Sequence, residues 1–197
     1  ISVGTTGESP TLSHDEHRKV VEICISESKG RVPVIAGAGS NNTHEAVELA
    51  KHAEKAGADA VLIVTPYYNK PTQQGLYLHF KAIAQATPDL PLILYTVPGR
   101  TSVHLSIECI ERLCEFKNIV AVKDATGDLV YGADLIKRCG HRLSMLSGDD
   151  PTFLPYLALG GKGAISVLSN LSPVALQKLW ILFQDGDLAQ CRALFQQ

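Results

Sequence analysis

The sequence predicts an α/β fold of the (β/α)8 TIM-barrel type, because short apolar runs alternate with amphipathic stretches of helical period along the whole chain. The runs are rich in β-branched residues and lack a clean apolar–polar alternation, which is typical of parallel strands buried on both faces. The runs are Ile1–Val3, Val34–Ala36, Ala60–Val64, Leu92–Tyr95, Ile119–Val122, Leu143–Leu146 and Ala164–Val167.

Seven strands are awkward for a closed parallel barrel, since eight is the common closed number. We therefore expect the first strand–helix unit to precede Ile1 and be absent from this chain. The alternative is an open, doubly wound sheet, but no GxGxxG follows the first run and no GxxxxGK[ST] is present, which disfavours its nucleotide-binding versions. With no linker-like stretch, residues 1–197 are expected to form a single barrel domain.

Helix boundaries are marked by capping residues in the stretches between the runs. A serine or asparagine followed three residues later by glutamate fits a capping box, a proline fits the first helical position, and a glycine fits a helix end. These signals are Ser13 with Glu16, the weaker pair Asn42 with Glu45, Ser172 before Pro173, and Gly57 after Ala46–Ala56.

Composition favours a small-molecule enzyme or a protein-contact domain. The formal charge is −2 and 45% of the residues are hydrophobic, so the chain has a core but no basic surface for nucleic acid. No apolar run reaches the roughly 18 residues of a membrane span. Five cysteines without a CxxC pair predict reduced thiols in a cytosolic protein.

Lys123 is the strongest candidate for a catalytic residue, because it follows the apolar run Ile119–Val122 at the strand end where barrel active sites lie. Burial disfavours the ammonium form, lowers the pKa and supplies the free amine that attacks a carbonyl. The alternatives are a lysine paired with Asp124 or one whose amine extends to solvent.

Other polar residues follow the remaining runs. Tyr95 could relay protons or simply fill the barrel mouth, and Arg100 could bind a carboxylate in bidentate fashion or form a surface salt bridge. Thr5 and Thr6, in a glycine-flanked turn, could hold a carboxylate or only shape the turn.

Metal binding is not expected. His14 and His17 stand three residues apart, but no third ligand is obviously placed, so solvated helix-face residues are the favoured interpretation. Asp149 and Asp150 favour a turn or cap over a metal site.

Five motifs in order and in register resemble the dihydrodipicolinate synthases, a family of pyruvate-dependent lyases. They are Gly4-Thr5-Thr6-Gly7-Glu8-Ser9, Pro66-Tyr67-Tyr68-Asn69-Lys70-Pro71, Tyr95-Thr96-Val97-Pro98-Gly99-Arg100-Thr101, Val122-Lys123-Asp124-Ala125-Thr126-Gly127 and Leu146-Ser147-Gly148-Asp149-Asp150. The match runs along nearly the whole chain.

The resemblance implies a role for each matching residue. Lys123 forms a Schiff base with pyruvate and Tyr95 transfers protons at the imine. Thr5 and Tyr68 complete the proton relay, with Tyr68 reaching across a subunit interface. Substrate-binding positions are Thr6 and Ile165 for pyruvate, Arg100 for the carboxylate of aspartate β-semialdehyde, and Gly148.

The implied reaction is a condensation to 4-hydroxy-tetrahydrodipicolinate in lysine and diaminopimelate biosynthesis. It needs neither a metal nor an organic cofactor, and the implied assembly is a homo-oligomer, a dimer of dimers. The sister N-acetylneuraminate lyases have Gly-Ser-Thr-Gly-Glu at the first motif, whereas Thr5, Tyr68 and Arg100 favour the synthase branch. The alternatives are a sister sugar-acid aldolase and a non-catalytic truncated barrel that binds lysine or a partner subunit.

A second set of residues matches the family's site for feedback inhibition by lysine: Ser9, His14, His17, Asn41, Glu45 and Tyr67. Two positions depart from the family, which usually has Asn at Thr96 and Glu at Asp124. The family also continues into a C-terminal helical region beyond the position of Gln197, so we expect the domain to be incomplete at both ends.

Overall fold

The computed structural model describes residues 1–197 and contains one parallel sheet of six strands. The strands pair in the order of the chain, which contradicts a doubly wound sheet because that topology requires the strand order to reverse. Their bounds are β1 Ile35–Gly37, β2 Ala60–Val64, β3 Leu92–Thr96, β4 Ile119–Asp124, β5 Ser144–Ser147 and β6 Gly163–Ala164.

The first predicted strand, Ile1–Val3, is only an isolated parallel bridge between Ser2 and Ala36. Ser2 N donates to Ile35 O at 3.0 Å and Gly37 N donates to Ser2 O at 2.9 Å. Val3 has a φ of 43°, which ends the extended conformation at once. The last predicted strand is likewise shorter than expected, since β6 keeps two residues and pairs only with β5.

Helices connect the strands, as the sequence predicts. The α-helices are α1 His14–Ser28, α2 Thr43–Ala56, α3 Gln73–Ala86, α4 Pro98–Thr101, α5 Ile107–Leu113, α6 Leu129–Cys139, α7 Phe153–Ala158, α8 Pro173–Gln184 and α9 Leu188–Phe195. Short 3-10 turns are η1 Thr5–Gly7, η2 Ser9–Thr11, η3 Asp150–Thr152 and η4 Leu168–Asn170.

The capping predictions are confirmed at three of four sites. Ser13 forms a complete capping box with Glu16, and Gly57 ends α2 in the left-handed conformation with a φ of 88°. Asn42 caps α2, but the Glu45 carboxylate bonds elsewhere, so that box is half formed. Ser172 makes no side-chain cap, because its backbone has left the extended region that an N-cap requires.

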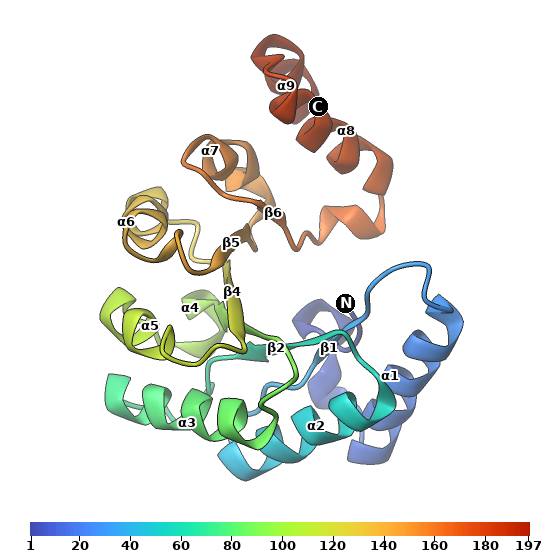
Figure 1. Ribbon diagram of the computed structural model, residues 1–197. Coiled ribbons are helices and arrows are strands. Elements are labelled where there is room, and N and C mark those ends of the chain that lie inside the picture. The colour runs from blue at the N-terminus through green and yellow to red at the C-terminus, as the bar shows by residue number, and fades with distance from the viewer.

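The two faces of the sheet pack differently, and this places the site. The outward face packs against α1, α2, α3, α5 and α6 in a core of 31 buried residues, and Figure 1 shows these helices around the outside of the sheet. The inward face carries a smaller cluster, which includes Leu62, Ile93, Tyr95, Val97 and Ala121. Because side chains alternate along a strand, residues with even and odd positions are divided between these faces.

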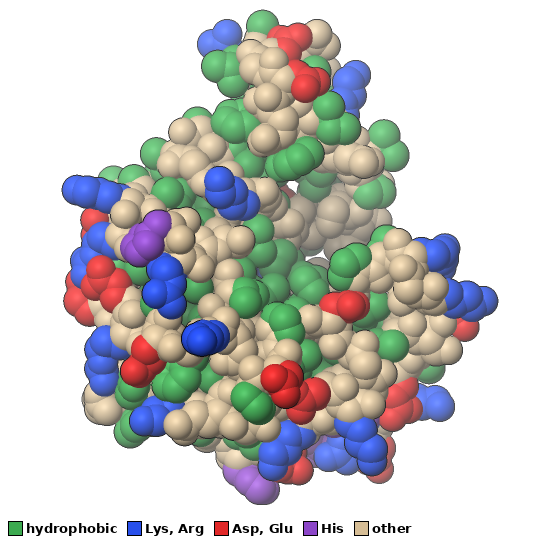
Figure 2. Space-filling view, in the orientation of Figure 1, with side chains coloured by type: hydrophobic (Ala, Val, Ile, Leu, Met, Phe, Trp, Pro, Cys, Tyr) green, Lys and Arg blue, Asp and Glu red, His purple; other side chains and the backbone are tan.

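The C-terminal helices α8 and α9 project away from the sheet beyond α7 (Figure 1). They join α7 through a separate cluster of Phe153, Leu157, Leu179 and Cys191. Figure 2 shows charges of both signs interspersed over the lower body, with no continuous basic patch on this face. All five cysteines are free, and none of the helices is both long and apolar enough for a membrane crossing.

Candidate active site

Lys123 and Tyr95 lie side by side on the inward face of the sheet. They are register partners on the neighbouring strands β4 and β3, and the Lys123 Nζ lies 4.0 Å from the centroid of the Tyr95 ring. Burial lowers the pKa of Lys123, Asp150 opposes the shift and the charge of Arg100 adds to it, and together they bring the pKa to about 8. About a tenth of this amine is therefore neutral at pH 7, far more than for an ordinary lysine, and the neutral form is the one that attacks a carbonyl.

Asp124 does not pair with Lys123, so this alternative from the sequence is wrong. Consecutive strand residues point to opposite faces, and the buried Asp124 side chain points outward. Its Oδ1 accepts hydrogen bonds from Thr126 N at 2.9 Å and from Thr126 Oγ1 at 2.7 Å. Burial raises the pKa of this carboxyl. Asp124 thus shapes the loop after β4 and leaves the lysine without a close carboxylate.

Gly148 makes room for the lysine side chain. A Cβ at this position would lie 2.7 Å from Lys123 Cε and 2.8 Å from Ala125 Cβ, distances that real structures do not show. The glycine follows β5, the next strand along the sheet, and its N–H donates to Asp124 O at 2.6 Å. The glycine therefore permits the lysine stem to lie flat against the loop that follows β5.

The Tyr95 hydroxyl has polar neighbours at the end of the sheet. Burial raises the pKa of the phenol, whereas a hydrogen bond with Thr5 and the positive charge of Arg100 act in the opposite direction. Thr5 begins η1, and Arg100 lies in α4 directly after β3. Arg100 forms no ion pair in the structure, so the alternative of a surface salt bridge is wrong and its guanidinium can accept an external anion.

A cavity of about 590 Å³ lies between η1, α1, α2 and α4, and neither Lys123 nor Tyr95 lines it. Many predicted site residues line it: Thr5, Ser9, His14, His17, Glu45, Tyr67, Tyr68 and Arg100. Thr6 and Asn41 do not line it. Thr6 is exposed, and the backbone O of Asn41 accepts a hydrogen bond from Asn69 Nδ2. Ile165 packs beside Tyr95 in the inward cluster.

Tyr68 stands at the rim with its side chain directed away from the protein. It is 90% exposed, forms no hydrogen bond, and has a φ of 71°, which is unusual for a residue other than glycine. Within this chain it does not reach Tyr95, so the structure does not bring the whole predicted relay together.

His14 and Glu45 form an ion-pair contact across the cavity wall, 2.9 Å between Nε2 and Oε1, and Ser40 donates to the other carboxylate oxygen. His17 is buried, and burial lowers its pKa. No three His, Cys, Asp or Glu side chains come close enough together to form a metal site.

The two aspartates after β5 act as caps, as the sequence favoured. Asp149 accepts from Thr152 N at 3.2 Å, and Asp150 accepts from Val167 N and Leu168 N at 3.1 and 2.9 Å. Sequence reasoning missed that Asp150 also opposes the pKa shift of Lys123. Its position after the strand adjacent to that of Lys123 was the available signal.

Comparison with known proteins decides the family. A sequence model of the dihydrodipicolinate synthetase family matches residues 1–197. The chain belongs to the dihydrodipicolinate synthetase family. A 4-hydroxy-tetrahydrodipicolinate synthase of Rhodopseudomonas palustris (strain BisA53) is 60% identical over 189 residues, which are 96% of this chain and 64% of that protein. The chain thus spans somewhat less than two thirds of that relative's length.

Solved structures of family members share the fold. The Acinetobacter baumannii dihydrodipicolinate synthase in complex with pyruvate is 50% identical, with a TM-score of 0.94 over 98% of this chain and 66% of that chain. The Cyanidioschyzon merolae enzyme with lysine bound is 43% identical, with a TM-score of 0.95 over 98% of this chain and 66% of that chain. The resemblance inferred from five motifs is therefore confirmed.

Proposed function

We propose that the protein condenses pyruvate with aspartate β-semialdehyde to give 4-hydroxy-tetrahydrodipicolinate, as a lyase of lysine and diaminopimelate biosynthesis in the cytosol. The observation that carries the proposal is the Lys123 amine, which lies against Tyr95 with its pKa lowered to about 8. The relatives named as 4-hydroxy-tetrahydrodipicolinate synthases support the synthase over a sugar-acid aldolase. The parallel sheet, in this proposal, is part of a (β/α)8 barrel.

The chemistry begins when the neutral Lys123 amine attacks the keto carbon of pyruvate. The resulting carbinolamine loses water to give a protonated imine, which withdraws electrons from the adjacent methyl carbon. That carbon loses a proton through Tyr95 and becomes an enamine, which attacks the aldehyde carbon of the second substrate. The new alkoxide takes up a proton, and the substrate amine then attacks the imine carbon, closes the ring and releases Lys123.

Substrate recognition falls to the residues at the rim. Thr6, Ile165 and Gly148 hold pyruvate, and Arg100 receives the carboxylate of the aldehyde. Thr5 joins Tyr95 in the proton relay, which fits its effect on the pKa of that phenol.

Tyr68 completes the relay from a neighbouring subunit. Its 90% exposure and the lack of any partner within the chain favour this assignment, since an outward tyrosine at a rim is suited to an interface. The protein is accordingly proposed to be a homo-oligomer, a dimer of dimers.

Chemical trapping tests the central step. The complete natural protein is incubated with pyruvate, reduced with borohydride and weighed intact, with Lys123→Ala as the control. One pyruvate adduct on the wild type and none on the variant is the expected result. A folded wild-type protein without adduct would refute the proposal.

Lysine is the proposed feedback inhibitor, bound by Ser9, His14, His17, Asn41, Glu45 and Tyr67. Five of these six residues line the cavity, and a family member has been solved with lysine bound. The Glu45 carboxylate, which faces the cavity beside His14, is suited to an ammonium group. Glu45→Gln should weaken inhibition by lysine and leave pyruvate trapping unchanged, whereas equal inhibition of both proteins would exclude Glu45 from the lysine site.

A further inference from the structure

The backbone that carries Arg100 determines where its guanidinium lies. The side chain of Arg100 makes no ion pair that would fix it directly. Thr101 Oγ1 donates to Val97 O at 3.2 Å and to Val103 O at 3.0 Å, so the backbone of α4 is tied to the residues after it. Any contact that holds Val103–Ser106 therefore also places Arg100.

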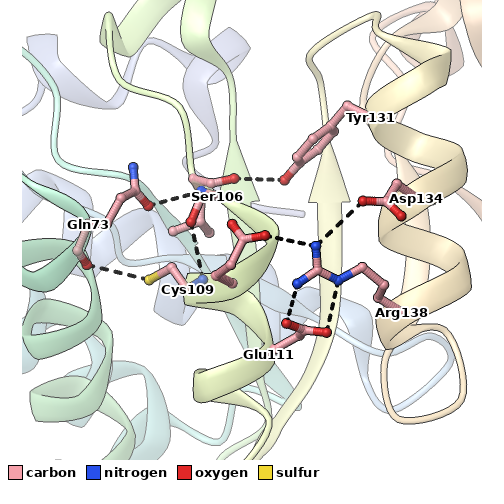
Figure 3. Close-up of polar contacts among 9 residues, drawn as sticks. Gln73, Ser106, Cys109, Glu111, Tyr131, Asp134 and Arg138 are labelled. Atoms are coloured by element: carbon pink, nitrogen blue, oxygen red, sulfur yellow. Dashed lines mark hydrogen bonds and ion pairs between the residues drawn. The ribbon is translucent and has the colours of Figure 1, made fainter.

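Tyr131 holds this segment from the side of α6. Its hydroxyl donates to Leu105 O at 2.8 Å (Figure 3). The centroid of its ring lies 4.5 Å from that of the His104 ring in an edge-on arrangement. Leu105 is fully buried, and burial raises the pKa of Tyr131, so the phenol stays protonated and donates at all working pH values. Arg138 ties α6 to α5 through Glu108 and Glu111, which makes α6 a fixed support.

Gln73 holds the same segment from the side of α3. Its Nε2 donates to His104 O at 2.7 Å, and its Oε1 accepts from Ser106 N at 3.0 Å. Its own carbonyl accepts from Cys109 Sγ at 3.5 Å (Figure 3). Gln73 is the first residue of α3, immediately after the loop that carries Tyr68.

The third support comes from β3. Leu105 N lies 3.5 Å from Thr96 Oγ1, and Thr96 directly follows Tyr95. Three consecutive residues of irregular backbone, His104 to Ser106, are thus bound by side chains from α3, β3 and α6. Of these elements, β3 carries Tyr95, and the loop before α3 carries Tyr68.

We propose that Tyr131 and Gln73 are positioning residues, which hold Val103–Ser106 and so set where Arg100 meets the carboxylate of the aldehyde substrate. This inference rests on the proposed function. It concerns the second substrate, because pyruvate capture depends on the Lys123 amine and the two substitutions leave Arg100 and its charge in the protein.

Steady-state kinetics on the complete natural protein test the inference with matched controls. Tyr131→Phe removes one hydrogen bond to the segment, and Gln73→Ala removes two. The control variants are Tyr77→Phe and Gln74→Ala, which remove the same chemical groups from α3. In the wild type the Tyr77 hydroxyl bonds to Glu115 and the Gln74 amide bonds to Arg112, so neither contacts the segment. The first two should raise KM for aspartate β-semialdehyde roughly two- to tenfold, the effect of one net hydrogen bond. The two control variants should leave KM for aspartate β-semialdehyde unchanged. The rate of pyruvate trapping should equal that of the wild type in all four variants.

A double-mutant comparison separates positioning from general loosening of the fold. If Tyr131 acts through Arg100, Tyr131→Phe should have no further effect on this KM in an Arg100→Ala background. Equal effects in both backgrounds, or an unchanged KM in both Tyr131→Phe and Gln73→Ala, would overturn the inference while the proposed function stands. A wild type that traps pyruvate but does not consume the aldehyde would overturn the proposed function, and the inference with it.

Discussion

Replacing Gly148 with alanine should disable the lysine while leaving the fold largely intact. The added Cβ would lie 2.7 Å from Lys123 Cε and 2.8 Å from Ala125 Cβ. Ordinary carbon–carbon contacts are about 3.5 to 4.0 Å, so the lysine side chain must move by about 1 Å. The far end of the lysine is flexible, but Ala125 Cβ is fixed to the backbone and the loop must shift as well, so we expect a loss of about 1 to 3 kcal/mol in the free energy of unfolding.

The loss of reactivity should be much larger than the loss of stability. A displacement of about 1 Å in a reacting group lowers the rate roughly a hundredfold, because the attacking atom no longer approaches in line. Imine formation by Gly148→Ala should therefore be slower by about two orders of magnitude.

The assay is the rate at which borohydride traps pyruvate on the intact protein, followed by mass spectrometry. Gly163→Ala is the matched control, because its Cβ would meet only Leu146 Cδ2 at 3.8 Å, an ordinary contact. Thermal unfolding shows whether each variant is folded. Trapping by Gly148→Ala at the wild-type rate would refute the reasoning that this glycine holds the space for Lys123.

Three further predictions follow from buried ionisable groups. The trapping rate should rise with pH, reach half of its maximum at about pH 8 and level off at about pH 9, where most of the Lys123 amine is neutral; an equally steep rise from pH 9 to 10 would contradict its lowered pKa. Lys123→Met should raise the melting temperature at pH 7, because below pH 8 the buried ammonium destabilises the wild type by roughly 3 kcal/mol. The difference in stability between the variant and the wild type should shrink between pH 8 and 10.5, because the wild type becomes more stable over that range. Burial lowers the pKa of His79 from 6.5 to about 4, so the stability of the wild type should fall as the pH drops through this window, by roughly 3 kcal/mol in full. Urea unfolding of His79→Leu should show a flatter dependence between pH 6.5 and 4, and an equally steep one would mean that other groups cause the loss.

Local patterns in the sequence determined most of the architecture. Six of the seven apolar runs are strands of the sheet. Ser13 begins helix α1 and Gly57 ends helix α2, as expected. These features are local, because burial on both faces demands apolar runs and helix ends demand particular side chains. The first run could not be assigned correctly from its composition, since the positive φ of Val3 is a matter of backbone path.

The sequence also singled out Lys123 and Tyr95, because a polar residue at the end of a buried strand is unusual wherever that strand lies. Only the tertiary structure decided which neighbours these residues have. It turned Asp124 away from the amine, placed Gly148 against the lysine stem, and directed Tyr68 out of the chain. Residues far apart in sequence, such as Gln73, Leu105 and Tyr131, come together only when strands pair in register and helices pack beside them. A local sequence pattern does not predict such contacts, because it contains no information about which distant segments become neighbours.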